Sequence, residues 1–310
     1  MRLLTRSDFD GLACGTLLEY LGYVDEWKFV HPKDIQDGLV TATDNDILAN
    51  IPYIKGCALW FDHHSSESER LGRKVYFEGV SRKAPSCAHV VYDFYGGEAK
   101  LGRFRSMIEY VDKVDSGDLT IDEIVDPKGW ILLGFIMDPR TGLGRFTNFT
   151  ISNYELMEKL AKACIDMQIN DILALPDVKE RLDVYFEHST PYREMLTRYS
   201  HVEDNVVVID LRGVNPIYVG NRFIVYTLFP EQNISVWTLD GKLKVNTAIT
   251  VGYSIINKTA TVDVGSLLLK YGGGGHHQVG TCQVAYEDCD KVVQEIIDKC
   301  KTSDEPPIKA

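Results

Sequence analysis

The stretch Lys55-Gly-Cys-Ala-Leu-Trp-Phe-Asp-His-His64 decides the fold, because an apolar run in it leads directly into one carboxylate and two imidazoles. Residues 57–61 are apolar and follow a glycine, a pattern that predicts a short buried strand. In an open parallel sheet, groups just beyond the carboxyl ends of the strands face the ligand crevice. We therefore expect Asp62, His63 and His64 to lie at a functional site, although a His-His pair taken alone is equally typical of a solvated loop.

Two other stretches carry polar groups in comparable positions. Residues 1–5 predict a strand that runs into Arg6-Ser-Asp-Phe-Asp-Gly11, so that Asp8 and Asp10 precede the first predicted helix. Near the other end of the chain, Tyr271-Gly-Gly-Gly-Gly-His-His-Gln-Val-Gly280 places five glycines and two histidines in one loop. Such a loop lets the backbone approach a ligand closely and presents its amide groups.

Together, these three stretches resemble the DHH phosphoesterase family with its DHH-associated C-terminal domain. That family includes RecJ-like exonucleases, nanoRNases, bisphosphate nucleotidases, cyclic-dinucleotide phosphodiesterases and exopolyphosphatase-like proteins. The resemblance covers nearly the whole chain, and the ordered set Asp-x-Asp-Gly, Asp-His-His and Gly-Gly-Gly-His is far more specific than any one motif. It implies a doubly wound, mostly parallel α/β domain over residues 1–195, a smaller α/β substrate-binding domain over 200–310, and a cleft between them.

The segments between the motifs agree with two domains. Residues 153–198 predict a helical connection with a break near Pro176. After residue 200 the composition changes to β-rich segments with short turns. The predicted strands there are 205–209, 223–228, 234–239 and 243–250, followed by a closing helix over 287–300.

The resemblance also implies a second and a fourth acidic motif. For the second, Asp46 is the better match, because the register of Asp-Ile-x-x-Asn-Ile-Pro-Tyr follows it; Asp44 is the alternative, and an ordinary Asp-Asn-Asp turn remains open. For the fourth, Asp115 stands in an Asp-Ser-Gly sequence at the end of an amphipathic helix. Carried over by motif, one metal site has Asp8 and Asp46, and the other has Asp10, Asp46, His63 and Asp115.

The same resemblance implies the chemistry. In the family, two divalent metals are bridged by the second-motif aspartate and by a hydroxide that attacks phosphorus in line. The catalytic groups implied here are Asp46, Asp62 and His64, with His64 facing the substrate phosphate. Mixed carboxylate and imidazole ligands suit Mn²⁺ best, with Mg²⁺ as the second option.

One residue departs from the family pattern. Family members usually carry His-x-Asp-x-Asp-Gly, and Arg6 stands at the histidine position. A guanidinium stays protonated and offers only donors, so it is unable to ligate a metal. We therefore expect a weakened first metal site, with Arg6 as a candidate contact to the substrate phosphate.

The C-terminal glycine loop supplies further candidates for substrate binding. Its backbone amides and one imidazole are suited to a phosphate, whereas the alternative is a flexible surface turn. The candidates are Gly273, Gly274, Gly275, His276, Arg222 and Asn257, with Arg212 as a weaker one and solvated or structural roles as the alternative for the last three.

Composition and charge limit the partners. The net charge of −12 argues against long nucleic acid, which proteins bind by neutralising many phosphates with Lys and Arg. A small phosphorylated substrate remains compatible, because a metal and a few basic groups hold it. The seven cysteines are scattered without Cys-x-x-Cys spacing, and no apolar stretch approaches bilayer length. We expect a cytoplasmic protein without membrane contact; its oligomeric state stays open, with a homodimer as one option.

The sequence thus predicts a metal-dependent phosphoesterase that acts on short oligoribonucleotides, bisphosphonucleotides or dinucleotides. The preference for short substrates is an inference from charge. An exopolyphosphatase is the first alternative. The second is a non-catalytic nucleotide or metal sensor, although clustered carboxylates that repel each other are costly to keep without a cation.

Overall fold

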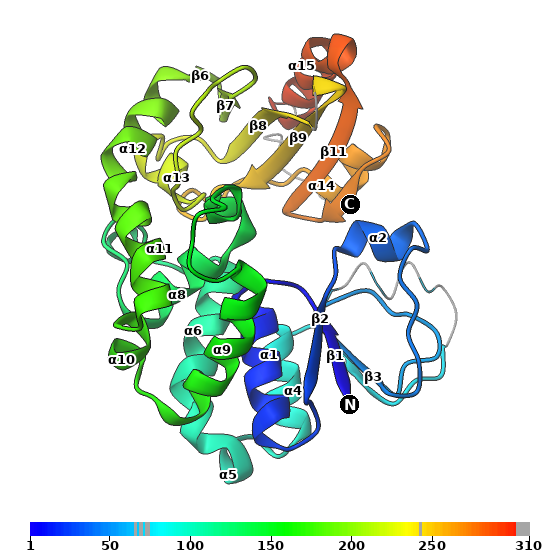
Figure 1. Cartoon of the computed structure of the whole chain (residues 1–310). Coiled ribbons are helices and arrows are strands. Elements are labelled where there is room, and N and C mark those ends of the chain that lie inside the picture. Colours follow the sequence, from blue (N-terminus) through cyan, green and yellow to red (C-terminus); the bar gives the residue numbers. More distant parts are fainter. Residues whose placement is uncertain (65–66, 68–70, 72–74, 242–243, 302–310) are drawn as a thin grey trace. The chain divides into compact units, whose positions relative to one another are not determined.

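The computed structural model describes residues 1–64, 67, 71, 75–241 and 244–301 and contains two compact units (Figure 1). The first unit consists of residues 1–119 and 126–187, and the second of residues 120–125 and those from 188 onward. The division after Glu187 comes earlier in the chain than the boundary at 195–200 that we expected from the sequence. Each unit has its own sheet, described separately below.

The first unit is built on a sheet of five parallel strands in the order β2-β1-β3-β4-β5. The strands are β1 (Arg2–Thr5), β2 (Glu26–Phe29), β3 (Asp46–Ala49), β4 (Leu59–Asp62) and β5 (Gly79–Ser81). The predicted doubly wound parallel sheet is therefore confirmed. Strands β1 and β3 are neighbours although β2 lies between them in the chain, so the strand order reverses there. Ligands of such sheets bind at this point, outside the carboxyl ends of the strands.

Helices flank this sheet, and several begin at a side-chain cap. Asp8 accepts the N–H of Gly11 (2.9 Å) at the start of α1, and Ser86 accepts the N–H of His89 (3.1 Å) at the start of α4. The helices of this unit are α1 (Phe9–Tyr20), α2 (Pro32–Gln36), α4 (Cys87–Phe94), α5 (Gly97–Leu101), α6 (Arg105–Ser116), α8 (Gly129–Met137), α9 (Asn153–Asp166), α10 (Ile169–Leu173) and α11 (Pro176–Glu187), with the 3₁₀ turns η1 (Gly102–Phe104), η2 (Pro139–Thr141) and η3 (Leu143–Arg145). The predicted break near Pro176 is real, because α11 begins at that proline.

Apolar side chains on both faces explain why these strands are continuous hydrophobic runs. Leu4, Leu48 and Trp60 are almost fully buried on one face, in a core that includes Ile35 of α2. Phe61 is fully buried, and its ring packs edge-on against Phe94 of α4, 5.1 Å away. Parallel sheets are covered on both faces in this way, which fixes the register of the strands and the position of their ends.

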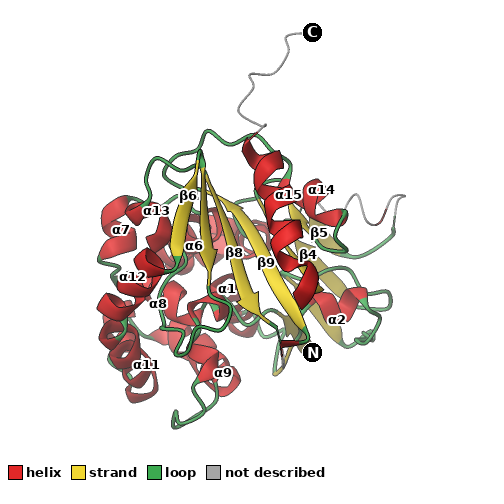
Figure 2. Cartoon of the chain, turned by 90° about the horizontal axis from the view of Figure 1, so that it is seen from above, coloured by secondary structure: helices red, strands yellow, loops and turns green. Residues whose placement is uncertain are grey.

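The second unit contains a six-stranded sheet in the order β10-β11-β9-β8-β7-β6, in which only the β7–β8 pair is parallel. Figure 2 shows β8 and β9 side by side, with α15 packed across them. The strands are β6 (Ser200–Glu203), β7 (Val206–Asp210), β8 (Ile234–Asp240), β9 (Asn246–Tyr253), β10 (Gly274–His276) and β11 (Val279–Ala285). The helices are α7 (Ile121–Val125), α12 (Ser189–Arg198), α13 (Ile224–Leu228), α14 (Val264–Leu269) and α15 (Cys289–Lys301), with the 3₁₀ turn η5 (Tyr286–Asp288).

One predicted strand of this unit is wrong. The predicted strand 223–228 is instead occupied by the helix α13, Ile224–Leu228, although β-branched and aromatic residues favour a strand there. Asn221 organises the turn before the helix: its side-chain oxygen accepts the N–H of Phe223 (3.1 Å), and its amide donates to the carbonyl of Ile124 in α7 (3.1 Å). These tertiary bonds outweigh the local preference of the sequence.

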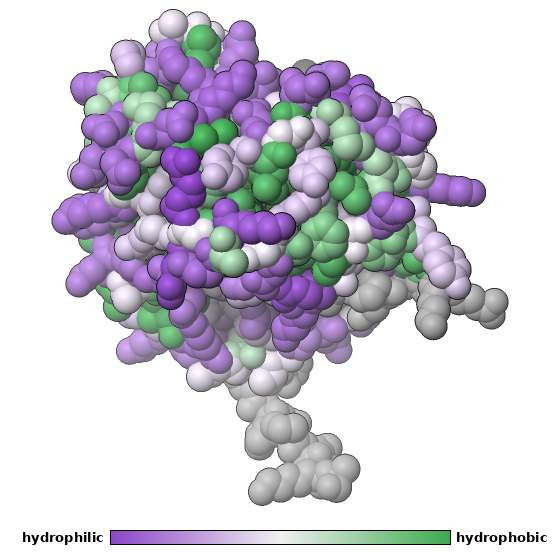
Figure 3. Space-filling view, turned by 90° about the horizontal axis from the view of Figure 1, so that it is seen from below, coloured by the Kyte–Doolittle hydropathy of each residue, from purple (hydrophilic) through white to green (hydrophobic). Residues whose placement is uncertain are grey.

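The surface agrees with the acidic, polar composition. Figure 3 shows hydrophilic side chains over most of one face, with apolar ones between them. Among the exposed large apolar residues are Leu39, Tyr76 and Leu269, and isolated residues of this kind are normal on protein surfaces. In the described part of the chain, no helix is both long enough and apolar enough to span a bilayer.

Candidate metal and phosphate site

Three predicted ligands meet beyond the carboxyl ends of β1 and β4. Asp10 follows β1, His63 follows β4, and Asp115 lies in the last turn of α6. Nε2 of His63 lies 3.4 Å from Oδ2 of Asp115 and 3.7 Å from Oδ2 of Asp10. One ligand atom from each of the three residues lies within 4.8 Å of the other two. Among the described residues, this is the group whose composition and spacing fit a divalent cation.

Asp10 is fixed by the amino end of α4. Its Oδ2 accepts the N–H of Cys87 (2.9 Å), and its Oδ1 accepts the N–H of Ala88 (2.7 Å). Ser86, which caps this helix, also donates to Asp112 of α6 (2.6 Å). The residue is only 2% exposed, and burial, followed by the negative charges of Asp115 and Asp8, raises the pKa of Asp10 well above its ordinary value. A bound cation would relieve this repulsion.

His63 is oriented for ligation by a carbonyl. Its Nδ1 lies 3.2 Å from the carbonyl oxygen of Ala84, which suits an N–H at that nitrogen and leaves the lone pair of Nε2 toward the two carboxylates. The Asp115 side chain is 31% exposed, so the group is open to solvent on one side. The pKa of Asp115 is also raised, first by partial burial and then by Asp8, against the opposing charge of His63. The three groups thus fit a divalent ion with an open coordination position.

Asp62 and His64 form a second pair at the end of β4. Nδ1 of His64 lies 2.7 Å from Oδ1 of Asp62, and the Asp62 side chain is fully buried. Burial raises the pKa of Asp62 to about 7, and burial together with the charge of His63 lowers the pKa of His64 to about 4. The carboxyl group therefore holds the imidazole in one orientation. Asp62 itself is a positioning residue, because it lies beneath His64 and away from solvent.

Asp8 lies beside this group, but donors surround its carboxylate. Oδ1 accepts the N–H of Gly11 (2.9 Å) and the side-chain amide of Asn50 (3.0 Å), while Nε of Arg6 lies 3.2 Å from Oδ2. Gly11 has to be glycine, since a Cβ there would lie 2.1 Å from the carbonyl oxygen of Arg6. The close turn therefore keeps Arg6 and Asp8 together.

Asp46 is absent from this region, and the prediction that it bridges two metals is wrong. It is the first residue of β3 and is paired in register with Arg2, whose Nε and Nη2 donate to it at 2.7 and 3.1 Å. The alternative, Asp44, precedes it in the chain. A strand rises about 3.3 Å per residue, so four residues separate Asp46 from the carboxyl edge by about 10 Å or more. The error came from treating Asp46 as the residue after a strand.

Asn50 occupies the place that was expected for an aspartate. It directly follows β3, has a left-handed backbone (φ 59°), and is 2% exposed. Its N–H bonds to the carbonyl oxygen of Phe61 in β4 (3.1 Å). The signal was present in the sequence, because Asn50 is the polar residue after the apolar run 47–49, just as Asp62 ends the run 57–61.

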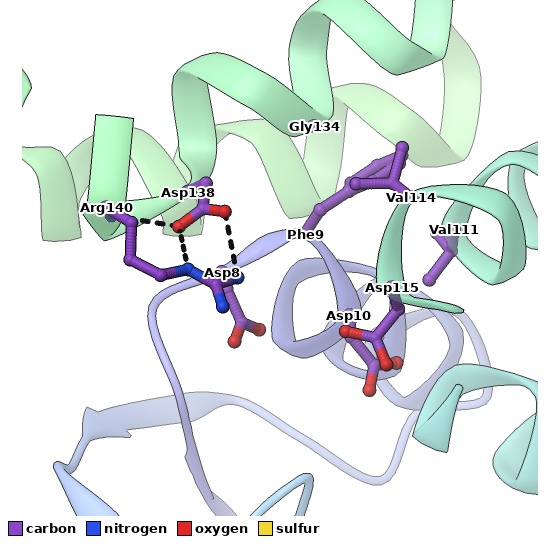
Figure 4. A pocket seen from close by; sticks show the side chains of 9 residues that line it. All are labelled: Asp8, Phe9, Asp10, Val111, Val114, Asp115, Gly134, Asp138 and Arg140. Carbon is purple, nitrogen blue, oxygen red and sulfur yellow. Dashed lines mark hydrogen bonds and ion pairs between the residues drawn. The ribbon is translucent and has the colours of Figure 1, made fainter. Parts of the chain in front are cut away.

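Arg140 completes the site and was also missed. A recess of about 20 Å³, roomy enough for a water molecule or an ion, is lined by Asp8, Asp10, Asp115, Asp138 and Arg140 (Figure 4). Asp138 caps η2 and holds Nε and Nη2 of Arg140 at 2.7 and 2.8 Å. The loop after α8 contains the Asp-Pro-Arg sequence, in which an ion pair two residues apart was the available signal.

In the second unit, the predicted substrate residues differ in their backbone conformation and hydrogen bonds. The glycine loop forms β10 and the turn before it, and Gly275 is required there, because its φ is +157° and a Cβ would lie 2.2 Å from the carbonyl oxygen of Val279. His276 ends this strand. The amide of Asn257 donates to Glu231 (2.7 Å) and accepts from Thr259 (2.7 Å), so both its ends hold a loop.

Two arginines of this unit also have structural contacts. The guanidinium of Arg222 lies over the ring of Phe223, with its carbon 4.2 Å from the centroid. Arg212 forms a forked pair with Asp210 at 2.9 and 2.6 Å and contacts Asp290 at 2.7 Å. Arg212 is therefore committed to holding β7 and the start of α15 together.

The chain is similar to the solved structure of a pGpG-specific phosphodiesterase, PggH, from Vibrio cholerae. The sequences are 45% identical, the match covers 97% of this chain and 99% of that chain, and the TM-score is 0.80. An exopolyphosphatase-related protein from Bacteroides fragilis shares the fold at 13% identity, with coverage of 97% and 92% and a TM-score of 0.53. Neither the family models nor the curated proteins compared with the chain gave a match.

The chain belongs to the DHH family of phosphoesterases. It is a hydrolase of phosphoric ester bonds, and its Asp10, His63 and Asp115 group supports a divalent metal ion. The Asp10, His63 and Asp115 group fits such an ion on the chemistry of its donors alone. These residues would hold the ion, which would supply a water molecule of lowered pKa and polarise a phosphoryl oxygen. The sequence-based predictions of family and enzyme class are thereby confirmed, and the sensor alternative is set aside.

We predict that Asp46→Asn lowers stability and leaves turnover within about twofold of wild type. Burial alone would raise the pKa of Asp46, but hydrogen bonds from Arg2 and Thr43 hold it below its ordinary value. Breaking this pair should cost about 1–3 kcal/mol of the free energy of unfolding. Because the folded pKa is lowered, the contribution is present above about pH 4 and is lost on acidification. Urea unfolding at pH 7 and pH 3 measures it; a tenfold loss of turnover in folded protein would return Asp46 to the site.

We predict the opposite pattern for Asp115→Asn. This side chain is partly exposed at the end of α6, so the free energy of unfolding should change little, while the affinity for Mn²⁺ should fall by about tenfold or more. Calorimetric titration with Mn²⁺ measures the affinity, and Asp46→Asn is the matched control. Unchanged Mn²⁺ affinity in Asp115→Asn would remove Asp115 from the metal site.

Proposed function

We propose that this chain hydrolyses the linear dinucleotide pGpG. The observation that carries the proposal is the 45% identity to a pGpG-specific phosphodiesterase, which extends over nearly the full length of both chains. The balanced reaction adds water across the internal diester: an oxygen of water bonds to phosphorus, the bond from phosphorus to the 3′ oxygen breaks, and that oxygen takes up a proton. The products are two molecules of GMP.

The residues of the first unit would have two roles, metal binding and contact with the phosphate. Asp10, His63 and Asp115 would hold the divalent ion beside the scissile phosphate. His64, which Asp62 keeps in place, would contact the phosphate with its Nε2 edge. The imidazole in this set favours Mn²⁺ over Mg²⁺, because Mg²⁺ prefers all-oxygen coordination. Arg6 weakens any further metal site at Asp8, since it offers no ligand and adds a positive charge.

The second unit would bind the rest of the nucleotide. Its candidates are the backbone of Gly273, Gly274 and Gly275, the imidazole of His276, and the guanidinium of Arg222. A glycine backbone accepts a close approach of a phosphate or a base, and the stacked guanidinium of Arg222 suits an anion. Asn257 is left out, because its side chain is engaged in its own loop. Dimer formation and location in the cytoplasm remain proposals from the sequence.

A substrate panel tests the proposal. Purified protein is incubated with pGpG, pApA, cyclic di-GMP and polyphosphate, each with Mn²⁺ and with EDTA, and the products are separated by chromatography. We expect GMP from pGpG, at a rate at least tenfold above that of the other three, and no GMP with EDTA. Faster cleavage of polyphosphate would favour the exopolyphosphatase reading, and faster cleavage of another dinucleotide would contradict the guanine preference.

The far-unit contacts predict a specific kinetic change. His276→Ala should raise the KM for pGpG by about tenfold and leave the Mn²⁺ content unchanged, because His276 is proposed to contact the nucleotide and is not among the proposed metal ligands. A loss of one charged hydrogen bond has this size. The matched control is His277→Ala, the neighbouring histidine. Equal effects of the two substitutions would remove His276 from the substrate site.

A further inference from the structure

We propose that the catalytic site holds one divalent ion, and that the guanidinium groups of Arg6 and Arg140 take the place of a second ion by binding the scissile phosphate. This inference rests on the proposed function for the identity of the phosphate. Its part on metal content stands on the geometry and charge of the site residues and does not depend on the substrate.

Asp8 is unsuited to a second ion. Its Oδ1 already accepts two hydrogen bonds, from Gly11 and from the amide of Asn50, and its Oδ2 faces Nε of Arg6 at 3.2 Å. A cation there would have to displace these donors. It would also stand beside a permanent positive charge, because a guanidinium keeps its proton.

Asn50 directly follows β3, the strand between β1 and β4. A carboxylate in this position is what would join two ions. Asn50 is neutral, and its amide nitrogen points at Asp8, so it acts as a donor. Its buried position and its backbone bond to Phe61 hold it there. The site therefore lacks a negatively charged ligand at the position from which one carboxylate would contact two ions.

The balance of charge at the site also favours a single ion. The recess and its rim contain four carboxylates and two guanidinium groups, which leave a net charge of about −2. The groups are Asp8, Asp10, Asp115, Asp138, Arg6 and Arg140. One divalent ion neutralises this charge, whereas two would leave a surplus of +2 before substrate arrives. Because buried charges need partners, the set is complete with one ion and a phosphodiester then binds to the cations.

Arg140 is held so that one edge of its guanidinium remains for a ligand. The Asp138 carboxylate accepts hydrogen bonds from Nε and Nη2 on one edge of the guanidinium. The Arg140 side chain is 46% exposed and lies beside Asp8 in the recess (Figure 4). Burial alone would lower the pKa of Arg140, but Asp138, Asp8 and Asp115 raise it. Within the described chain, Nη1 of Arg140 and both terminal nitrogens of Arg6 make no hydrogen bond to an acceptor.

Two planar guanidinium groups near the proposed ion suit a phosphodiester. A guanidinium donates two parallel hydrogen bonds to phosphate oxygens, and such fixed donors stabilise the charge that develops in the transition state. Arg6 and Arg140 would therefore be catalytic residues, with Asp8 and Asp138 as the positioning residues that aim them.

Metal content tests the first half without any nucleotide. We expect elemental analysis and calorimetric titration with Mn²⁺, alone and with inorganic phosphate, to find one tightly bound ion per chain in the wild type. The double variant Arg6→His with Asn50→Asp restores two ligands and should bind a second ion at least tenfold more tightly than the wild type does. Two equally tight ions in the wild type would overturn the proposal, as would a double variant that folds and still binds one.

Kinetics test the second half. Arg6→Gln and Arg140→Gln should each lower kcat/KM for pGpG by about 100-fold while the Mn²⁺ content stays at one, and Arg140→Lys should recover part of the loss. Arg105→Gln, an exposed arginine of α6 paired with Glu109, is the control for charge alone and should retain activity. Losses below threefold in both site variants would overturn the role of the arginines.

These outcomes separate the two proposals. If the wild type binds one ion but does not cleave pGpG, the proposed substrate is wrong and the proposal of a single ion still holds. A wild type that cleaves pGpG and binds two ions equally well would sink this inference alone.

Discussion

The site depends on one buried carboxylate and the two backbone amides that receive it. Asp10, the first-turn residue of α1, accepts hydrogen bonds from the N–H groups of Cys87 and Ala88 at the start of α4. These bonds tie the segment after β1 to the segment after β5, because α4 follows β5 in the chain. Phe94 of α4 also packs against Phe61 of β4. A negative charge at a helix amino end is favourable, which offsets part of the cost of burying it.

Bonds near the same helix start also position the other two proposed ligands, Asp115 and His63. Ser86 caps α4 and donates to Asp112, so the same helix start also holds α6, whose last turn carries Asp115. The carbonyl of Ala84, two residues before the cap, orients His63. The ion-binding group is thus assembled by a few bonds around the first turn of α4. At positions 84, 87 and 88 these bonds use only backbone groups, whereas Asp10, His63, Ser86 and Asp112 contribute their side chains.

Part of this could be predicted from the sequence, and the missed parts have a physical cause. The apolar run ending in Asp62-His63-His64 has the length of one buried strand, so its end and its ligands were found. Asp46 was misplaced because a strand of four residues gives no periodicity by which to tell its first residue from one that follows another strand. Asn50 was therefore overlooked, although it ends a similar run. Arg140 lay in a loop without regular structure, where only the tertiary fold shows what it faces.

The same limits apply to the second unit. The helix α13 formed against the local preference of its residues, because Asn221 and the neighbouring helix α7 fix the turn before it. The glycines of the loop around β10 are required by close backbone packing, so their number alone did not measure ligand binding. Position, and not composition, decides which polar groups of this unit reach a nucleotide.

The central claim is that a divalent ion is bound by Asp10, Asp115 and the imidazole of His63. Pulsed electron paramagnetic resonance of the Mn²⁺-loaded protein tests it most directly, because a coordinated imidazole gives a nitrogen modulation of the manganese signal. The account predicts modulation from a single imidazole nitrogen in the wild type and its loss in His63→Gln. Modulation that persists in His63→Gln, or that is absent from the wild type, would contradict it.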